Sequence, residues 1–426
     1  MPEETGVVVP LSVLGDLRRL GRWLRAETCR LDDEEIQLVE SAQQKILDYN
    51  LSAYILETDK TEALQGVFAR LNSTGVRMRA DEVFQALLGM DAPDHRGIDL
   101  NRLQAACNRD GFGLPPRQEV LKTVLAISDR DPSRRLQVLD EEALTELVDQ
   151  TACEEALQRT VEFLQDPPES AEPGCGIPCY DFIPYPVVFS LLAKFFHLFP
   201  YPPVECRKEL AKWLWRGFIT GAHQRAAVSR MREQARLIVG DSPDQVVAGL
   251  MHFVSAPGGV DWSLERFDSR NARSRIEILA LLSLVPRYRD GQAVSPQALI
   301  SLEQRVAREI VRVPDNKRAR LAPETRRLLL SAANRALLDT SHTGLQKELR
   351  TWDPQMDAVA LQSHLLDEET WRCLVEDDLD SFLRKRAPRV RNLVSTFLTD
   401  RAGLGSPFLG PITRYLDTDS GPSQVE

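Results

Sequence analysis

Apolar residues recur along most of this chain at the spacing of an amphipathic helix. Leu64, Val67, Phe68 and Leu71 fall at positions i, i+3, i+4 and i+7, which together make one face of a helix. Helical patterns also run through three longer stretches, at 139–165, 187–199 and 241–254. The pattern therefore predicts a chain that is mainly α-helical.

Two of the predicted helices begin with the same pair of residue types. Ser242 precedes Pro243 and Ser295 precedes Pro296, so each serine would cap a helix whose first residue is proline. The segment 139–165 has acidic residues in its expected first turn, where the helix dipole favours negative charge. These signals predict helix starts near 243 and 296.

Strand signals are few. "SAYILE" (52–57) has an aromatic and a β-branched residue, and "GVVVPLSVL" (6–14) is a second candidate that Pro10 would confine to a sheet edge. Two strands make no stable sheet. The predicted fold class is mainly α, with helical bundle-like domains and a small α/β remnant at the N-terminus. The predicted regions are a partial α/β region at 1–90, a helical domain at 91–254, a helical C-terminal region at 255–414 and a disordered tail at 415–426.

Composition indicates an ordinary globular protein. The chain has 426 residues, of which 43% are hydrophobic and 27% charged, enough for two or three packed units. The N-terminal stretch lacks the basic start of a signal peptide, and no apolar run reaches the length of a membrane span. Seven scattered cysteines favour a reduced, cytoplasmic protein, and the lack of a long apolar run indicates that it does not contact a membrane.

Potential metal ligands are sparse. Cys175 and Cys179 lie four residues apart in a Gly/Pro-rich loop, but no second ligand pair follows them. The six histidines are isolated from one another, and no H-x-x-x-H pattern occurs. We therefore predict no metal site.

Arginine is dense in three stretches, at 224–236, 316–327 and 384–391. Helices that carry several of these side chains could hold DNA phosphates. The candidate DNA-binding residues are Arg225, Arg232, Arg236, Arg318 and Arg320. The alternative is a solvated face whose arginines pair with the abundant Asp and Glu, and the net charge of −10 favours that interpretation.

The stretch "GVFARLNSTGVRMRADEVFQALL" (66–88) joins two apolar-striped segments through a polar turn. Gly75 supplies a left-handed conformation there, and a second helix is expected near Ala80, with Glu82 at its positive end. This local reading does not explain why Arg70 and Asn72 flank the turn. Side by side, a guanidinium and an amide suit a phosphate or a carboxylate.

These residues carry a resemblance to a known family. The segment 53–88 resembles the central F-x-R-x-N-x-x-G-x-x-L motif, followed by an acidic residue, of the N-terminal domain of GmrSD-type restriction endonucleases. The matching residues are Phe68, Arg70, Asn72, Gly75 and Glu82, while Met78 replaces the leucine. Weaker similarity extends from about residue 35 to 400. The resemblance implies a ParB-like nucleotide-binding fold and a role in restricting foreign DNA.

Two family motifs are absent from this sequence. No D-G-Q-Q-R segment precedes the motif, and the similar "RDGQ" at 289–292 lies far downstream. The H-H-x-F-P signature of the family's nuclease domain is also missing. A histidine-dependent nuclease cannot activate water without that base. No catalytic residue is therefore assigned.

The expected function follows from these matches and departures. We expect a non-catalytic or split component of a GmrSD-like DNA restriction and phage-defence system. A separate N-terminal partner polypeptide would supply the missing half-site and allow activity with a nucleoside triphosphate and Mg²⁺. Arg70, Asn72, Gly75 and Glu82 are the nucleotide- or partner-binding candidates. The alternatives are a self-standing helical DNA-binding or protein-interaction module, and a gene fragment without a function of its own.

Overall fold

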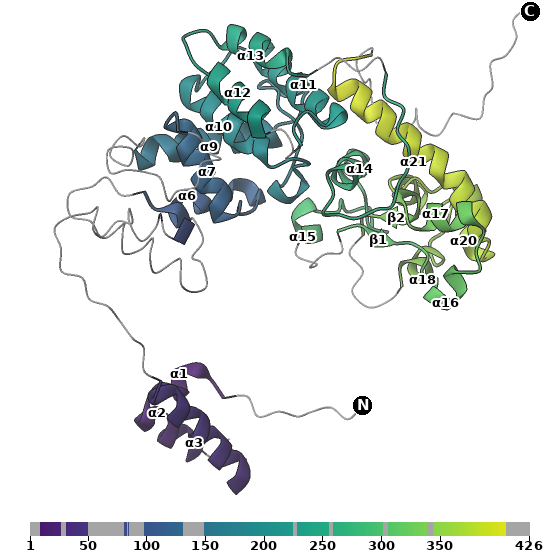
Figure 1. Cartoon of the computed structure of the whole chain (residues 1–426). Coiled ribbons are helices and arrows are strands. Elements are labelled where there is room, and N and C mark those ends of the chain that lie inside the picture. The colour runs from purple at the N-terminus through teal and green to yellow at the C-terminus, as the bar shows by residue number, and fades with distance from the viewer. Residues whose placement is uncertain are drawn as a thin grey trace, which may run out of the picture. The chain divides into compact units, whose positions relative to one another are not determined.

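The chain divides into two compact units, Met1–Arg70 (unit 1) and Leu71–Glu426 (unit 2). A computed structural model describes residues 9–26, 31–49, 81–82, 84, 98–130, 149–224, 228–254, 259–300, 306–338 and 344–405. The described parts of both units consist mainly of helices (Figure 1), as the apolar spacing predicted.

The described part of unit 1 has three helices, α1 (Leu11–Leu14), α2 (Leu17–Leu24) and α3 (Asp33–Leu47). Helix α3 begins with a capping box, in which Asp32 and Glu35 each accept the other's backbone N–H. Helix α1 packs against both α2 and α3. Gln43 links α3 to α1, since its Nε2 donates to the carbonyl of Leu14 at 3.1 Å.

Unit 2 is a larger helical assembly. Its helices are α6 (Leu100–Ala106), α7 (Arg117–Ile127), α9 (Gln150–Gln165), α10 (Val187–Leu198), α11 (Val204–Thr220), α12 (Val228–Leu237), α13 (Pro243–Met251), α14 (Ala272–Leu282), α15 (Pro296–Ile300), α16 (Asp315–Arg318), α17 (Pro323–Leu329), α18 (Leu345–Leu349), α19 (Ala358–Gln362), α20 (Glu368–Val375) and α21 (Leu379–Arg401). Three 3₁₀ turns accompany them, η1 (Arg109–Gly111), η3 (Tyr180–Phe182) and η5 (Ala332–Asn334).

Helix α10 lies at the centre of the first half of unit 2. It packs against α7 and α9, and Phe189, Phe195 and Phe196 on it are fully buried. Its one lysine, Lys194, is also buried, and Nζ donates to the carbonyl of Ala235 at 2.8 Å. The prediction that 187–199 forms a buried core helix is confirmed.

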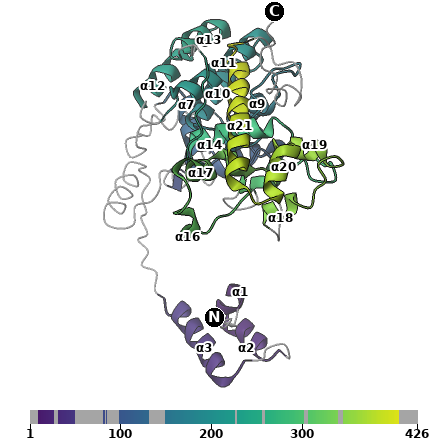
Figure 2. The ribbon, with the colours of Figure 1, turned by 90° about the vertical axis from the view of Figure 1, so that its right-hand side faces the viewer.

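Helix α21 connects the two halves of unit 2. It runs along the side of unit 2 that Figure 2 turns to the viewer, and it packs against α11, α14, α17 and α20. Near its end, Phe397 meets Trp215 of α11 edge to face, with ring centroids 5.2 Å apart. These contacts join the regions 91–254 and 255–414, whose boundary stays a prediction.

Only one small sheet occurs among the described residues. Strands β1 (Arg308–Glu309) and β2 (Arg335–Ala336) pair antiparallel, with Arg308 opposite Ala336 and Glu309 opposite Arg335. The candidate strand 52–57 lies outside the described residues, so the ParB-like α/β remnant stays a prediction.

Helix starts agree with the capping signals, while one strand candidate was wrong. Ser242 Oγ accepts the N–H of Gln245 at 3.4 Å, Pro243 is the first residue of α13, and α15 begins at Pro296. Within the strand candidate 6–14, residues 11–14 form the helical turn α1 and not a strand. Pro10 fixes φ at −63° as the N-cap of that turn. Of 139–165, only 149–165 is described, and it contains α9.

Candidate nucleic-acid interface

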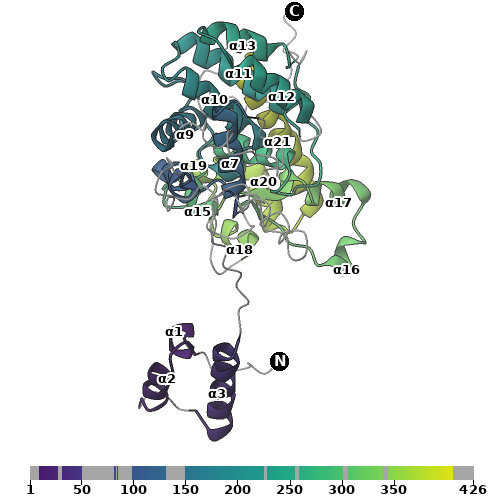
Figure 3. The same cartoon turned by 60° about the vertical axis from the view of Figure 1, so that its left-hand side comes forward.

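A group of cations without carboxylate partners surrounds α16 and α17. Residues 308–327 contain seven Lys or Arg and three Asp or Glu, in a chain whose net charge is −10. Four of these cations are exposed, and their side chains form no ion pair or hydrogen bond with the described residues: Arg312, Lys317, Arg320 and Arg326. We call these four residues the cationic segment. In Figure 3, α16 and α17 project from the rest of unit 2.

A groove of about 240 Å³ opens beside the cationic segment. Arg312 and Lys317 line it from one segment, and Asp377 and Asp378 line it from the turn before α21. Both carboxylates already bind within the chain, because Asp377 pairs with Arg350 and Asp378 caps α21. Their negative charge still opposes an anion inside the groove. A phosphate is therefore favoured at Arg320 and Arg326, the two residues of the cationic segment that do not line the groove.

The two predicted arginines of this region differ in availability. Arg318 Nη2 donates to the carbonyl of Val313 at 3.1 Å, and its Nη1 pairs with Asp315 at 3.2 Å. Its guanidinium is thus largely engaged within the loop. Arg320 is exposed and belongs to the cationic segment. Of this pair, Arg320 is the better phosphate ligand.

The other predicted arginines lie elsewhere in unit 2. Arg232 and Arg236 are exposed and one turn apart on α12, which packs against α10 and α13. Figures 1 and 2 place α12 and α16 at opposite ends of unit 2. The structure therefore brings Arg318 close to Arg320 and Arg232 close to Arg236, but it does not join the two pairs into one surface.

Four predicted site residues lie outside the described part of the chain: Arg70, Asn72, Gly75 and Arg225. Glu82 is described, and it is helical and exposed. Two residues further on, Phe84 is buried in the core of unit 2. The helix predicted to begin near Ala80 is thus present at 81, 82 and 84, while the nucleotide- or partner-binding role of this motif stays a prediction.

The carboxyl group of Glu277, on α14, is buried inside unit 2. Glu277 is 1% exposed, and its Oε1 accepts the indole N–H of Trp262 at 3.1 Å. Burial raises the pKa of Glu277 to about 7, although the indole hydrogen bond favours the charged form. Arg273 lies over the ring of Trp262, with its guanidinium 3.9 Å from the ring centroid. A carboxyl group so enclosed is out of reach of a substrate, and we interpret it as structural.

Arg386 on α21 is a fully buried cation. Its guanidinium donates to four backbone carbonyls, those of Ala332, Ala333, Arg335 and His364. Burial and the nearby Arg389 lower the pKa of Arg386 to about 9, which leaves it charged at neutral pH. The side chain therefore ties η5, β2 and the end of α19 to α21.

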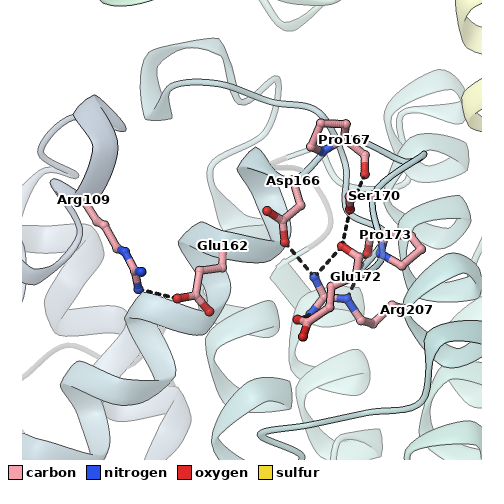
Figure 4. Close-up of polar contacts among 8 residues, drawn as sticks. All are labelled: Arg109, Glu162, Asp166, Pro167, Ser170, Glu172, Pro173 and Arg207. Carbon is pink, nitrogen blue, oxygen red and sulfur yellow. Dashed lines mark hydrogen bonds and ion pairs between the residues drawn. The ribbon is translucent and has the colours of Figure 1, made fainter.

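Arg207 on α11 has a similar role for the loop after α9. Its Nε donates to the carbonyl of Pro173 at 3.0 Å, and its Nη2 donates to Asp166 Oδ2 at 3.0 Å (Figure 4). The carbonyl of Glu172 accepts a third bond at 3.1 Å. Nearby, Arg109 and Glu162 form a separate ion pair (Figure 4). Arg207 is 6% exposed and so holds the loop in place rather than presenting a charge to a ligand.

Cys175 and Cys179 lie in this loop and are both buried. Burial raises the pKa of the Cys179 thiol to about 12, which disfavours the thiolate that a metal requires. Across the described ranges, no group of three or more His, Cys, Asp or Glu side chains is placed to hold a metal ion. A helix long and apolar enough to cross a bilayer is likewise absent from these ranges.

Sequence reasoning did not single out Arg312, Lys317 or Arg326. Arginine density drew attention to 316–327 but could not show which side chains lack an acidic partner. One usable signal was present, because Asp315 stands three residues before Arg318, the spacing of a helical ion pair. That spacing predicts that Arg318 is engaged.

No protein-family model matches this chain, and no curated protein sequence matches it. The family resemblance therefore rests on the motif residues at 68–82 and the weaker similarity around them.

Proposed function

We propose that this chain is a non-catalytic or split component of a GmrSD-like DNA restriction and phage-defence system. In this proposal the cationic segment contacts the phosphates of duplex DNA. A second polypeptide completes the nucleotide site, so that activity depends on a nucleoside triphosphate. The DNA contact is supported by one observation, four exposed cations without acidic partners on an acidic protein.

The dependence on a second polypeptide is supported by the sequence. Phe68, Arg70, Asn72, Gly75 and Glu82 match the family's motif, whereas the D-G-Q-Q-R segment is missing. Each half of such a site supplies only part of the phosphate contacts. Nucleotide binding by the chain alone should therefore be weak.

DNA binding can be tested by fluorescence anisotropy with a labelled duplex at several salt concentrations. The test variant replaces all four residues of the cationic segment with glutamine. Each phosphate contact contributes about 0.9 to the slope of log K against log salt, so losing four should reduce that slope by roughly 3–4. Affinity in low salt should fall at the same time.

A matched control removes cations that are already paired. Lys208 pairs with Glu205 at 2.6 Å, and Arg372 pairs with Glu368 at 2.8 Å, all on exposed surface. The variant Lys208→Gln with Arg372→Gln should bind DNA much as the wild type does. The control removes two charges and the test variant four, so a control loss of about half the test loss or more would show that only net charge matters, and the proposed interface would be wrong.

A self-standing DNA-binding or interaction module is the second candidate function. It also predicts DNA binding through the cationic segment, but without any effect of nucleotide. Adding a nucleoside triphosphate, Mg²⁺ and the candidate partner polypeptide to the anisotropy assay separates the two. Unchanged binding under these conditions favours the module.

A further inference from the structure

The described helices of unit 1 bury little apolar surface among themselves. Among its described residues, only Leu20, Val39 and Gln43 are buried. Six large apolar side chains are exposed instead: Leu11, Leu17, Leu38, Ile46, Leu47 and Tyr49. Packing among the described helices thus contributes little to the stability of unit 1, because helices gain most of their stability from a covered apolar face.

The exposed apolar side chains of α3 form a continuous line. Leu38, Ala42 and Ile46 follow one another at i, i+4 and i+8, and Tyr49 continues the line just past the helix end. Leu38 is 73% exposed and Tyr49 is 72% exposed. We call these four residues the open stripe. The buried Val39 lies beside it, so the apolar side of α3 is wide and the described residues of unit 1 cover only part of it.

The exposed charges of α2 and of the start of α3 have opposite signs. Arg18 and Arg22 on α2 and Arg25 at its C-cap are exposed at i, i+4 and i+7, and Arg18 and Arg22 form no ion pair with the described residues. On α3, the first turn carries the exposed Asp33 and Glu34. A surface with one basic and one acidic helix complements a second copy of itself when the copy is turned by a two-fold rotation.

We propose that unit 1 is a self-association element, in which the open stripes of two copies of this chain pack against each other. The basic helix α2 of each copy then faces the acidic start of α3 in the other copy, so the charge contact occurs twice. The acidic start of α3 opposes a nucleic acid on the same surface. This inference does not depend on the proposed function.

The full chain should behave as a dimer at micromolar concentration, with twice the 48.0 kDa mass of one chain in light scattering. The variant Leu38→Gln with Ile46→Gln should weaken dimerisation about a hundredfold or more, since each change acts in both copies. Leu114→Gln, at an exposed position of unit 2, is the matched control and should leave the dimer intact. A monomeric wild type, or a dimer that survives the stripe variant, overturns the proposal.

A charge-reversal pair tests the two-fold arrangement without relying on apolar substitutions. Arg18→Glu with Arg22→Glu, and Asp33→Lys with Glu34→Lys, should each lower dimer affinity about tenfold or more. Mixing the two variants should restore association as a heterodimer, because every reversed helix then faces an oppositely reversed helix. Circular dichroism checks that both variants keep their helical content. Failure of the mixture to associate more tightly than either variant alone would show that the helices do not meet across a two-fold axis.

Discussion

Replacing Arg386 with methionine removes the buried cation that ties α21 to its neighbours. The arginine donates to four backbone carbonyls and has no carboxylate partner among the described residues. Methionine retains the length and apolar stem of the side chain but has no donor. The substitution therefore isolates the contribution of the hydrogen bonds from that of packing.

The expected loss follows from the carbonyls that are left without a donor. The carbonyl of Ala332 also accepts the N–H of Arg335 and keeps that bond in the variant. The substitution therefore leaves the other three carbonyls without their donor. Each buried acceptor without a partner costs about 1–3 kcal/mol. Removing a buried charge offsets several kcal/mol of this cost. We expect a net loss of about 3–5 kcal/mol in the free energy of unfolding, and a Tm lower by roughly 4–7 °C.

Thermal and urea denaturation, followed by circular dichroism, measure this loss. Arg384→Met is the matched control, because Arg384 lies two residues away on the same helix and pairs with Asp380 and Glu324 at the surface. That exposed network should contribute less than about 1 kcal/mol. If Arg386→Met destabilised the protein no more than the control, the carbonyl contacts would not hold η5 and α19 as we argue.

Three further predictions concern other parts of the chain. Gly217→Ala should destabilise the protein by about 1–3 kcal/mol, although alanine favours helices, because the new Cβ would lie 1.8 Å from His223 Nε2. Gly249→Ala, whose new Cβ would have its nearest contact at 3.5 Å, should instead stabilise the protein by up to ~1 kcal/mol. Urea unfolding compares the two variants. Burial lowers the pKa of His223 from 6.5 to about 4, so the stability that this group contributes above pH 6.5 should be lost as the pH falls to 4. In urea titrations at several pH values, His223→Gln should make the free energy of unfolding depend less on pH over this range. Arg70→Ala with Asn72→Ala should leave the Tm nearly unchanged but abolish binding of nucleotide or of the partner polypeptide in calorimetry, and a large Tm loss with unchanged binding would contradict this role.

Helix positions were predictable wherever local signals decided them. Ser242 and Pro243 fixed the start of α13, because capping and the preset φ of proline act within one turn. The stretch 187–199 was predictable because it is apolar almost throughout. The turn at 11–14 was not, since a short apolar run around a proline fits a strand edge and a helix start equally well. The two-residue strands β1 and β2 carry no periodicity at all.

The roles of individual arginines were harder to predict. The run 384–391 looked like a solvated face by density, yet Arg386 is fully buried. Its spacing held the clue, because Phe382, Arg386 and Val390 fall at i, i+4 and i+8 on one side of α21, and both apolar neighbours are buried. Whether a buried arginine finds acceptors depends on carbonyls distant in sequence. No local pattern encodes those contacts.

The contact between α11 and α21 has a consequence for synthesis on the ribosome. Trp215 is fully buried in the finished protein, partly by Phe397. At ~5–20 residues per second, the stretch between the two is translated in roughly 10–35 s. During that time the indole lacks one of the surfaces that cover it, and the nascent chain exposes an aromatic patch to which chaperones could bind. Premature termination anywhere before α21 would leave that patch permanently open, so shortened products should aggregate or be degraded.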